Sequence, residues 1–240
     1  MKSWHTIHMK ILTWNCNQGI GNDFSAIKDF DADVVIIQEC EKLDKNSFES
    51  YSSHWIGNND RKGLAVLTKE KSELQTEVFN ESLIYFLPVS FKDTAVLGVW
   101  AFNRRARRKV EGSSGFPIDA ISHYKDWLTS HKNMIVAGDF NNGPRWDRPG
   151  SKNNFHTFNK EFSDLGLKST YHHLTGETPG QESKPTYYHQ RNPEKGFHID
   201  YIFSNLSGKG KVDIGDFKDW SKLSDHVPVV CQLNSNIVPS

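Results

Sequence analysis

The stretch Met134-Ile135-Val136-Ala137-Gly138-Asp139-Phe140-Asn141 decides the fold, because in it a buried strand runs directly into a group of polar side chains. Its first four residues are all apolar, which is typical of a strand covered by other layers on both faces. The acid and the amides follow where the strand ends, although Gly, Asp and Asn also favour simple turns. Because a sheet holds its strand ends rigidly, such ends often carry functional sites. The stretch therefore predicts a covered sheet with a candidate site at its edge.

The same kinds of pattern recur along the chain. Further strands are expected at 10–14, 34–37, 64–67, 83–86 and 96–100, and in the last third at 186–189, 198–203, 212–217 and 227–233. Helical spacing of apolar residues predicts helices over 23–30 and 117–130; a third is expected at 155–165, and a Gly/Pro-rich loop at 143–153. Strands outnumber helices, so an α/β fold with helices covering packed sheets fits best. We expect one domain over 10–234, with short tails at 1–9 and 235–240.

Composition limits the possible partners. The 240 residues carry 29 Lys plus Arg against 29 Asp plus Glu, so a broadly basic nucleic-acid surface is not indicated, although a local patch is allowed. Three cysteines without a regular framework indicate reduced thiols. No apolar stretch approaches the ~20 residues that span a bilayer, and no secretory signal is present. We expect a cytoplasmic monomer without a membrane partner.

Five polar blocks stand at strand ends or within an apolar strand. They are Trp14-Asn15-Cys16-Asn17, Gln38-Glu39, Gly138-Asp139-Phe140-Asn141, His198-Ile199-Asp200-Tyr201 and Ser224-Asp225-His226. Each has an ordinary interpretation alone, as a strand-terminating acid, a turn or a surface pair. The carboxylate in the fourth block is harder to dismiss, because a buried charge is costly unless it is paired or liganded. As a set, the blocks indicate a single site.

In this order the blocks resemble the endonuclease/exonuclease/phosphatase superfamily, which includes AP endonucleases, DNase I and inositol polyphosphate 5-phosphatases. The resemblance extends from Lys10 to about Leu233. It implies a four-layer α/β/β/α sandwich of two packed mixed sheets flanked by helices, with the site at one edge of the sheets. It also implies a Mg²⁺- or Mn²⁺-dependent phosphodiester hydrolase, most simply a nuclease acting on DNA or RNA.

The resemblance assigns the metal to three residues. Glu39 would be the main Mg²⁺ ligand, with Asn15 and Asp225 helping to hold the ion or its waters. Oxygen ligands and retained waters are what this ion favours.

The resemblance assigns the chemistry to four residues. Asp139 would orient or deprotonate the attacking water, and Asn141 would hold that water or a phosphate oxygen. His226 would contact the scissile phosphate, while Asp200 accepts its other N–H and fixes the ring. Asn15 would assist this group as well as the metal.

Substrate contacts are expected on both sides of this set. Trp100 occupies a slot where the family usually has Tyr or His, and Asn103 matches the family's Asn shortly after it. The basic run 104–109 begins with Arg104 and Arg105, and it is either a phosphate contact or a solvated loop. The aromatic residues Tyr187, Tyr188 and Phe197 line a sugar pocket or pack on the sheet. Arg145 and Trp146, in the loop after Asn141, bind a base or pack locally.

Three functions remain open at this point. A nuclease explains the acid, amide and histidine set together with the arginine run. A phosphatase or phosphodiesterase of a small or lipid phosphoester fits the neutral net charge slightly better. A family member that only binds nucleic acid or protein is suggested by Trp100 alone, since an indole cannot transfer a proton at ordinary pH.

Overall fold

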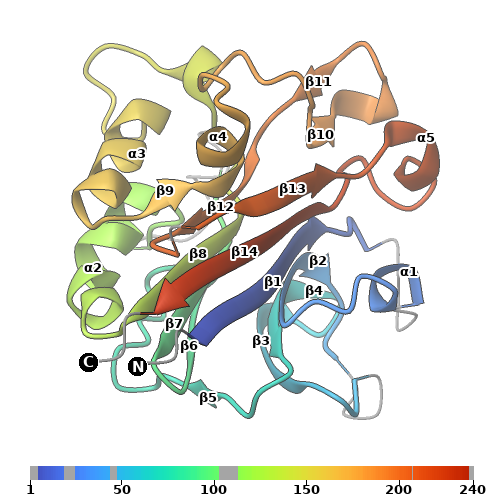
Figure 1. Cartoon of the computed structure of the whole chain (residues 1–240). Helices are drawn as coiled ribbons and strands as arrows, with labels where there is room; N and C mark the ends of the chain where they lie inside the picture. Colours follow the sequence, from blue (N-terminus) through green and yellow to red (C-terminus); the bar gives the residue numbers. More distant parts are fainter. Residues whose placement is uncertain (1–4, 19–24, 44–47, 103–112, 207, 238–240) are drawn as a thin grey trace.

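Two six-stranded sheets pack face to face in the computed structural model, which describes residues 5–18, 25–43, 48–102, 113–206 and 208–237 (Figure 1). The first sheet has the order β13 (Gly210–Ile214), β14 (Val229–Ile237), β1 (His5–Asn15), β2 (Val34–Cys40), β4 (Lys62–Thr68), β3 (Ser52–Asn59). The second has the order β5 (Glu73–Leu74), β6 (Phe86–Phe91), β7 (Thr94–Trp100), β8 (Asn133–Asp139), β12 (Asp200–Ser204), β9 (Lys168–Ser169). Both sheets are mixed, because β1 and β2 run parallel, as do β7 and β8, among antiparallel neighbours.

Helices and a small hairpin complete the layers. The hairpin pairs β10 (Tyr187–Tyr188) with β11 (Gly196–Phe197). The helices are α1 (Ser25–Lys28), α2 (Pro117–Thr129), α3 (Phe155–Asp164), α4 (Thr170–Thr175) and α5 (Phe217–Trp220). Short 3₁₀ turns cover Pro144–Trp146 and His189–Arg191. This is the α/β sandwich that the sequence predicted.

Alternation along the buried strands explains their consecutive apolar residues. In β2, Val34 and Ile36 enter the core between the two sheets, while Val35 and Ile37 face the outer layer around α1. In β8, Ile135 joins the inter-sheet core, and its neighbours pack under α2 and α3. Every position of the apolar runs 34–37 and 134–137 is therefore buried, as expected for strands with two covered faces.

One glycine marks a close approach of the two sheets. A Cβ added to Gly98 in β7 would lie 2.5 Å from Cγ2 of Val66 in β4. No side chain fits there without displacing the opposite sheet.

Several predicted boundaries were wrong. The strand expected at 83–86 begins only at Phe86, because Tyr85 has a φ of 60°, which interrupts an extended chain. The segments expected as tails are partly strand, since His5 pairs with Ile237 across β1 and β14. In the loop expected at 143–153, a 3₁₀ turn is present. The edge strand β3 and the helix α4 were missed.

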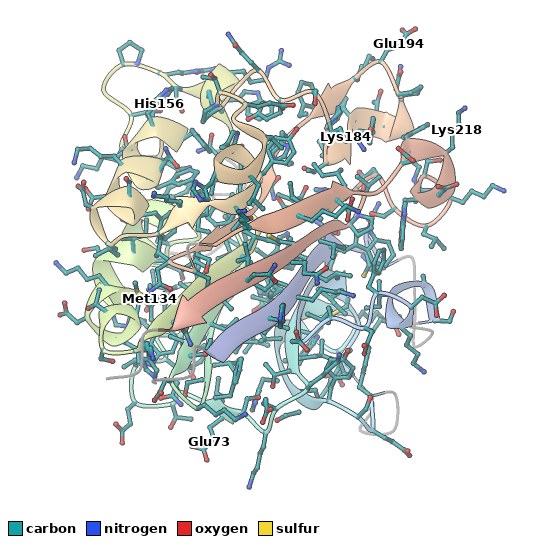
Figure 2. All side chains as sticks on the ribbon, viewed as in Figure 1. Glu73, Met134, His156, Lys184, Glu194 and Lys218 are labelled. Carbon is teal, nitrogen blue, oxygen red and sulfur yellow. The ribbon has the colours of Figure 1, made fainter. Side chains whose placement is uncertain are left out.

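Charged side chains cover the outside of the sandwich. Figure 2 shows Glu73, Glu194 and Lys218 pointing outward from the ribbon. Within the described ranges, no helix combines the length and the apolar character needed to cross a membrane.

Candidate active site

Strand register brings the polar blocks to one end of the two sheets. Asn15 ends β1 opposite Gln38 of β2, the residue before Glu39. In the second sheet Asp139, at the end of β8, lies between Trp100 of β7 and Asp200 of β12. Four blocks far apart in sequence therefore meet at a common edge.

Asp139 lies at the centre of the hydrogen-bond network and is buried. Its Oδ2 accepts from Asn15 Nδ2 at 3.0 Å and from Asn141 Nδ2 at 2.9 Å, and its Oδ1 accepts from the Asn141 backbone N–H at 2.8 Å. Burial and then the charge of Asp200 raise the pKa of Asp139 to about 7, although His226 and the amide donors act the other way. The carboxyl group can therefore exchange a proton near neutral pH.

The backbone at this edge adopts conformations that side chains rarely allow. Gly138 has a φ of +150°, and an added Cβ would lie 1.8 Å from the carbonyl oxygen of Val99. Glu39 and Asn141 have left-handed φ values of 58° and 47°. Such conformations cost free energy and cluster at functional sites.

Asp200 and His226 form a buried pair beside Asp139. Nδ1 of His226 lies 3.0 Å from Oδ2 of Asp200, and Oδ2 also accepts from the Thr186 hydroxyl at 2.6 Å. Burial is the largest single effect and lowers the pKa of His226. The charge and hydrogen bond of Asp200, together with the charges of Asp139 and Asp225, outweigh burial, and the pKa rises to about 9. Nε2 of His226 lies 4.0 Å from Oδ2 of Asp139. The imidazolium ring is thus held with Nε2 towards the central acid.

Two of the residues expected at the metal, Asn15 and Glu39, are in contact, and the third, Asp225, is held by Asn17. Asn15 Nδ2 is 3.3 Å from Glu39 Oε1, and Glu39 Oε2 forms an ion pair with Lys62. Asp225 Oδ1 accepts from Asn17 Nδ2 at 3.0 Å. Carboxylate and amide oxygens suit Mg²⁺, so the donor set at this edge fits the ion that the sequence predicted.

Asp139, Asp200 and His226 form another possible metal-binding group, because their ligand atoms lie within 4.8 Å of one another. Asp200 and His226 are already hydrogen-bonded to each other, and Asp200 also accepts from the Thr186 hydroxyl. We therefore interpret this group as proton-handling residues, and the Glu39 side as the better metal position.

Three of the expected substrate contacts lie beside the site, and they are Trp100, Tyr187 and Phe197. Trp100 is 9% exposed, packs against Tyr85 at 4.3 Å between ring centroids, and has Lys62 Nζ 5.2 Å from its ring. Tyr187 packs on His226 at 4.7 Å. Phe197 stacks on Tyr187 at 6.2 Å, which leaves both aromatic residues beside the site.

The four remaining expected contacts are Asn103, Arg104, Arg105 and Tyr188. Asn103, Arg104 and Arg105 fall outside the described residues. Tyr188 packs on Phe217 of α5 instead of on the His226 ring.

The sequence analysis assigned no role to three supporting residues, although Asn17 and Ser224 belong to its polar blocks. Thr186 holds Asp200, while Asn17 holds Asp225. Ser224 donates to the Asn15 carbonyl at 2.7 Å and accepts from the His226 N–H at 3.0 Å. Each is adjacent or next-but-one to a predicted residue, but a single hydroxyl or amide carries no sequence signal of its own.

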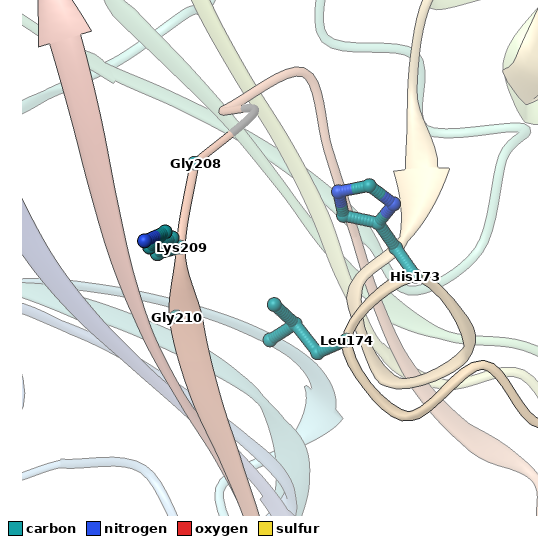
Figure 3. Close-up of a pocket in the computed structure, with 5 residues that line it drawn as sticks. All are labelled: His173, Leu174, Gly208, Lys209 and Gly210. Atoms are coloured by element: carbon teal, nitrogen blue, oxygen red, sulfur yellow. The ribbon is translucent and has the colours of Figure 1, made fainter.

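Another hollow lies away from this edge. It is shown in Figure 3 between α4 and β13 and is lined by His173, Leu174 and 208–210. Gly210 pairs with Leu233, at the end of β13 opposite to that nearest the site. Nothing in it brings together catalytic side chains.

Comparisons with known proteins agree with this geometry. A family model described as the endonuclease/exonuclease/phosphatase family matches residues 12–226. A search of curated proteins finds no match. Among solved structures, a 3′-5′ exonuclease from Neisseria meningitidis is 17% identical with a TM-score of 0.66, and an AP endonuclease from Archaeoglobus fulgidus is 18% identical with a TM-score of 0.65. A Neisseria 3′ phosphatase bound to product DNA hairpin is 17% identical with a TM-score of 0.65; each of the three alignments covers 94% of this chain and 99% of the other.

Proposed function

Because the chain belongs to the endonuclease/exonuclease/phosphatase family, whose members hydrolyse phosphoesters, we propose that it is a divalent-metal-dependent phosphodiester hydrolase acting on nucleic acid. The observation that carries the proposal is the buried Asp200–His226 pair, held next to Asp139 at the shared edge of the two sheets. This arrangement supplies a base and a cationic donor within one small volume.

Asp139 is the group that orients and deprotonates the attacking water. Asn15 and Asn141 fix its carboxylate, and a pKa of about 7 suits a base that works near neutral pH. His226 carries a positive charge at that pH and donates from Nε2 to a phosphate oxygen, while Asp200 fixes the ring. Asp139 takes up the proton of the attacking water, and His226 stabilises the negative charge that develops on the phosphate oxygens as water adds to phosphorus.

Glu39, with Asn15 and Asp225, holds Mg²⁺ or Mn²⁺ in this proposal. When bound, the cation neutralises charge on the phosphate and on the leaving oxygen. Lys62 forms an ion pair with the same Glu39 carboxylate, so its ammonium group balances the negative charge of that carboxylate when no cation is bound.

Nucleic acid is favoured as the substrate by the aromatic faces beside His226. Tyr187 packs on the His226 ring, and Phe197 stacks on Tyr187. Aromatic side chains of this kind commonly hold nucleic-acid bases by stacking. One structurally similar protein is described as bound to product DNA hairpin.

A small or lipid phosphoester is the second candidate, and it is favoured by the zero net charge. Salt dependence separates the two. Cleavage of a polyanion held by several cationic side chains falls steeply with salt, whereas hydrolysis of a small substrate changes little. A flat response of oligonucleotide cleavage between 50 and about 200 mM salt would move the proposal to the small substrate.

The decisive experiment removes the two reacting groups. We expect Asp139→Asn and His226→Ala to lose hydrolysis of an oligonucleotide while keeping the wild-type circular dichroism spectrum. Asp164→Asn, which changes an exposed acid on α3, is the matched control. Full activity in either site variant would refute the mechanism. Loss of activity in the control would point to a general effect of the substitution.

A non-catalytic role is the third candidate, and Trp100 is the residue that raises it. A non-catalytic role predicts that the protein binds its ligand without turnover, whatever substrate and metal are supplied. Cytoplasmic location, a monomeric state and a single domain over 10–234 stay predictions.

A further inference from the structure

A cavity of about 130 Å³ lies next to the candidate active site, between the loops at 143–146, 180–185 and 196–198. Phe197 forms part of its wall and stacks on Tyr187, which in turn packs on His226. Two aromatic rings, Phe197 and Tyr187, therefore lie between the cavity and His226.

Two hydrogen-bond acceptors line this cavity. Glu182 has a side chain that is 8% exposed, and its Oε1 accepts from the Gly180 N–H at 2.9 Å and from His172 Nε2 at 3.0 Å. Glu182 is also one of the residues that line the cavity. The cavity therefore has a carboxylate oxygen to offer.

His198 supplies the second acceptor and is 6% exposed. Its Nδ1 donates to the Lys184 carbonyl at 2.9 Å, and burial lowers the pKa of the ring, so Nε2 carries a lone pair. That Nε2 is buried and has no hydrogen-bond partner among the described residues. A buried acceptor without a partner is costly, and a bound donor would remove that cost.

The mouth of the cavity offers flat and cationic surfaces. Trp146 is 38% exposed, the largest exposure of any bulky apolar side chain in the described part of the chain. Its ring centroid is 5.3 Å from that of Phe197, and the Arg145 guanidinium lies 4.5 Å from the Phe197 ring. Aromatic and guanidinium planes are the surfaces on which bases stack.

We propose that this cavity binds a nucleobase that carries an exocyclic amino group, on the nucleotide next to the phosphate at His226. Glu182 and His198 accept from the amino group, and the base stacks on Trp146 and Phe197. Adenine, cytosine and guanine carry such a group, while thymine and uracil lack it. The position of this base relative to the cut rests on the proposed function, but binding of the base itself is measured separately.

Calorimetric titration with deoxyadenosine monophosphate tests the cavity without any turnover. The comparison ligand is the purine analogue that lacks only the 6-amino group. We expect the analogue to bind at least about tenfold more weakly, because two buried acceptors lose their donor. Equal affinities, or no detectable binding of either ligand at millimolar concentration, would overturn the proposal.

A pair of arginines in one loop provides the matched variants. Arg145 lines the cavity, whereas Arg148 is also exposed but does not. We expect Arg145→Ala and Trp146→Ala each to weaken deoxyadenosine monophosphate about five- to tenfold, and Arg148→Ala to leave the affinity unchanged. Equal effects of the two arginine variants would mean that general charge, and not the cavity, binds the ligand.

Hydrolysis of bis-p-nitrophenyl phosphate separates the two proposals, because this diester carries no nucleobase. If the protein hydrolyses this diester but binds both purine ligands equally, the proposed function is supported and the base cavity is refuted. A protein that discriminates the amino group but hydrolyses nothing keeps the cavity and loses the proposed function.

Discussion

Replacing Asp200 by Asn tests how the site controls the charge of its histidine. The pKa of His226 lies at about 9 against an ordinary 6.5, and at about 1.4 kcal/mol per unit the difference corresponds to about 3 kcal/mol. Burial opposes this shift, so nearby carboxylates supply the energy, and Asp200 is the largest contributor. An Asn at this position has no charge and presents an N–H to Nδ1. His226 then becomes neutral, with its proton on Nε2.

The expected result is a pKa of His226 below 7 in Asp200→Asn. We expect kcat/KM at pH 7.5 to fall about 100-fold, in line with the loss of about 3 kcal/mol. The assay is a proton NMR titration of the His226 ring, assigned by its absence in His226→Gln, together with pH profiles of hydrolysis. Asp213→Asn, an exposed acid on β13, is the control. A His226 pKa that stays near 9 in Asp200→Asn would refute the reasoning.

The same shift predicts how stability depends on pH. Because the folded-state pKa of His226 is raised, its stabilising contribution is complete below the unfolded value of about 6.5 and is lost as pH rises through about 9. Urea denaturation at pH 6 and 9.5 should show this loss in the wild type and a smaller one in Asp200→Asn. An equal loss in both proteins would contradict the assignment.

Three further substitutions probe the support of the site. Thr186→Val removes the hydroxyl that donates to Asp200 at 2.6 Å and accepts from two backbone N–H groups, so we expect about 2 to 3 kcal/mol less unfolding free energy in urea; an unchanged midpoint would contradict this. Gly138→Ala places a Cβ 1.8 Å from the Val99 carbonyl oxygen, and should lower the melting temperature by several degrees; an unchanged Tm would show that the strand shifts freely. Glu39→Gln should raise the Mg²⁺ concentration for half-maximal activity at least about tenfold, and an unchanged value would place the metal elsewhere.

The buried strands were predictable because their apolar runs reflect two covered faces. In β2 and β8 every residue of the run packs into one of two cores, which is why the pattern lacks alternation. The edge strand β3 is only half-buried, so its sequence has no such run. Tyr85 shows another limit, since its positive φ depends on surrounding packing that no local pattern reveals.

The candidate site was predictable where polar residues stand in or directly beside an apolar strand. Asp139, Asp200 and His226 come together as expected, and so does Asn15. No role was predicted for Thr186, because its hydrogen bond to Asp200 depends on how the neighbouring hairpin packs in the folded chain.

The unpartnered nitrogen of His198 could not be foreseen, because lacking a partner is a property of the folded environment. The sequence left two interpretations open for Arg145 and Trp146, contact with a base and local packing. The structure places both residues at the cavity that His198 lines.

The central claim is metal-dependent hydrolysis of a phosphodiester at the end of the two sheets. It is tested most directly by incubating the purified protein and its Glu39→Ala variant with Mg²⁺ or Mn²⁺. The panel contains single- and double-stranded DNA, an abasic duplex, RNA and bis-p-nitrophenyl phosphate. We predict cleavage of at least one polynucleotide that requires the metal and is lost in the variant. Absence of turnover on every substrate, or equal cleavage by the variant, would contradict the account.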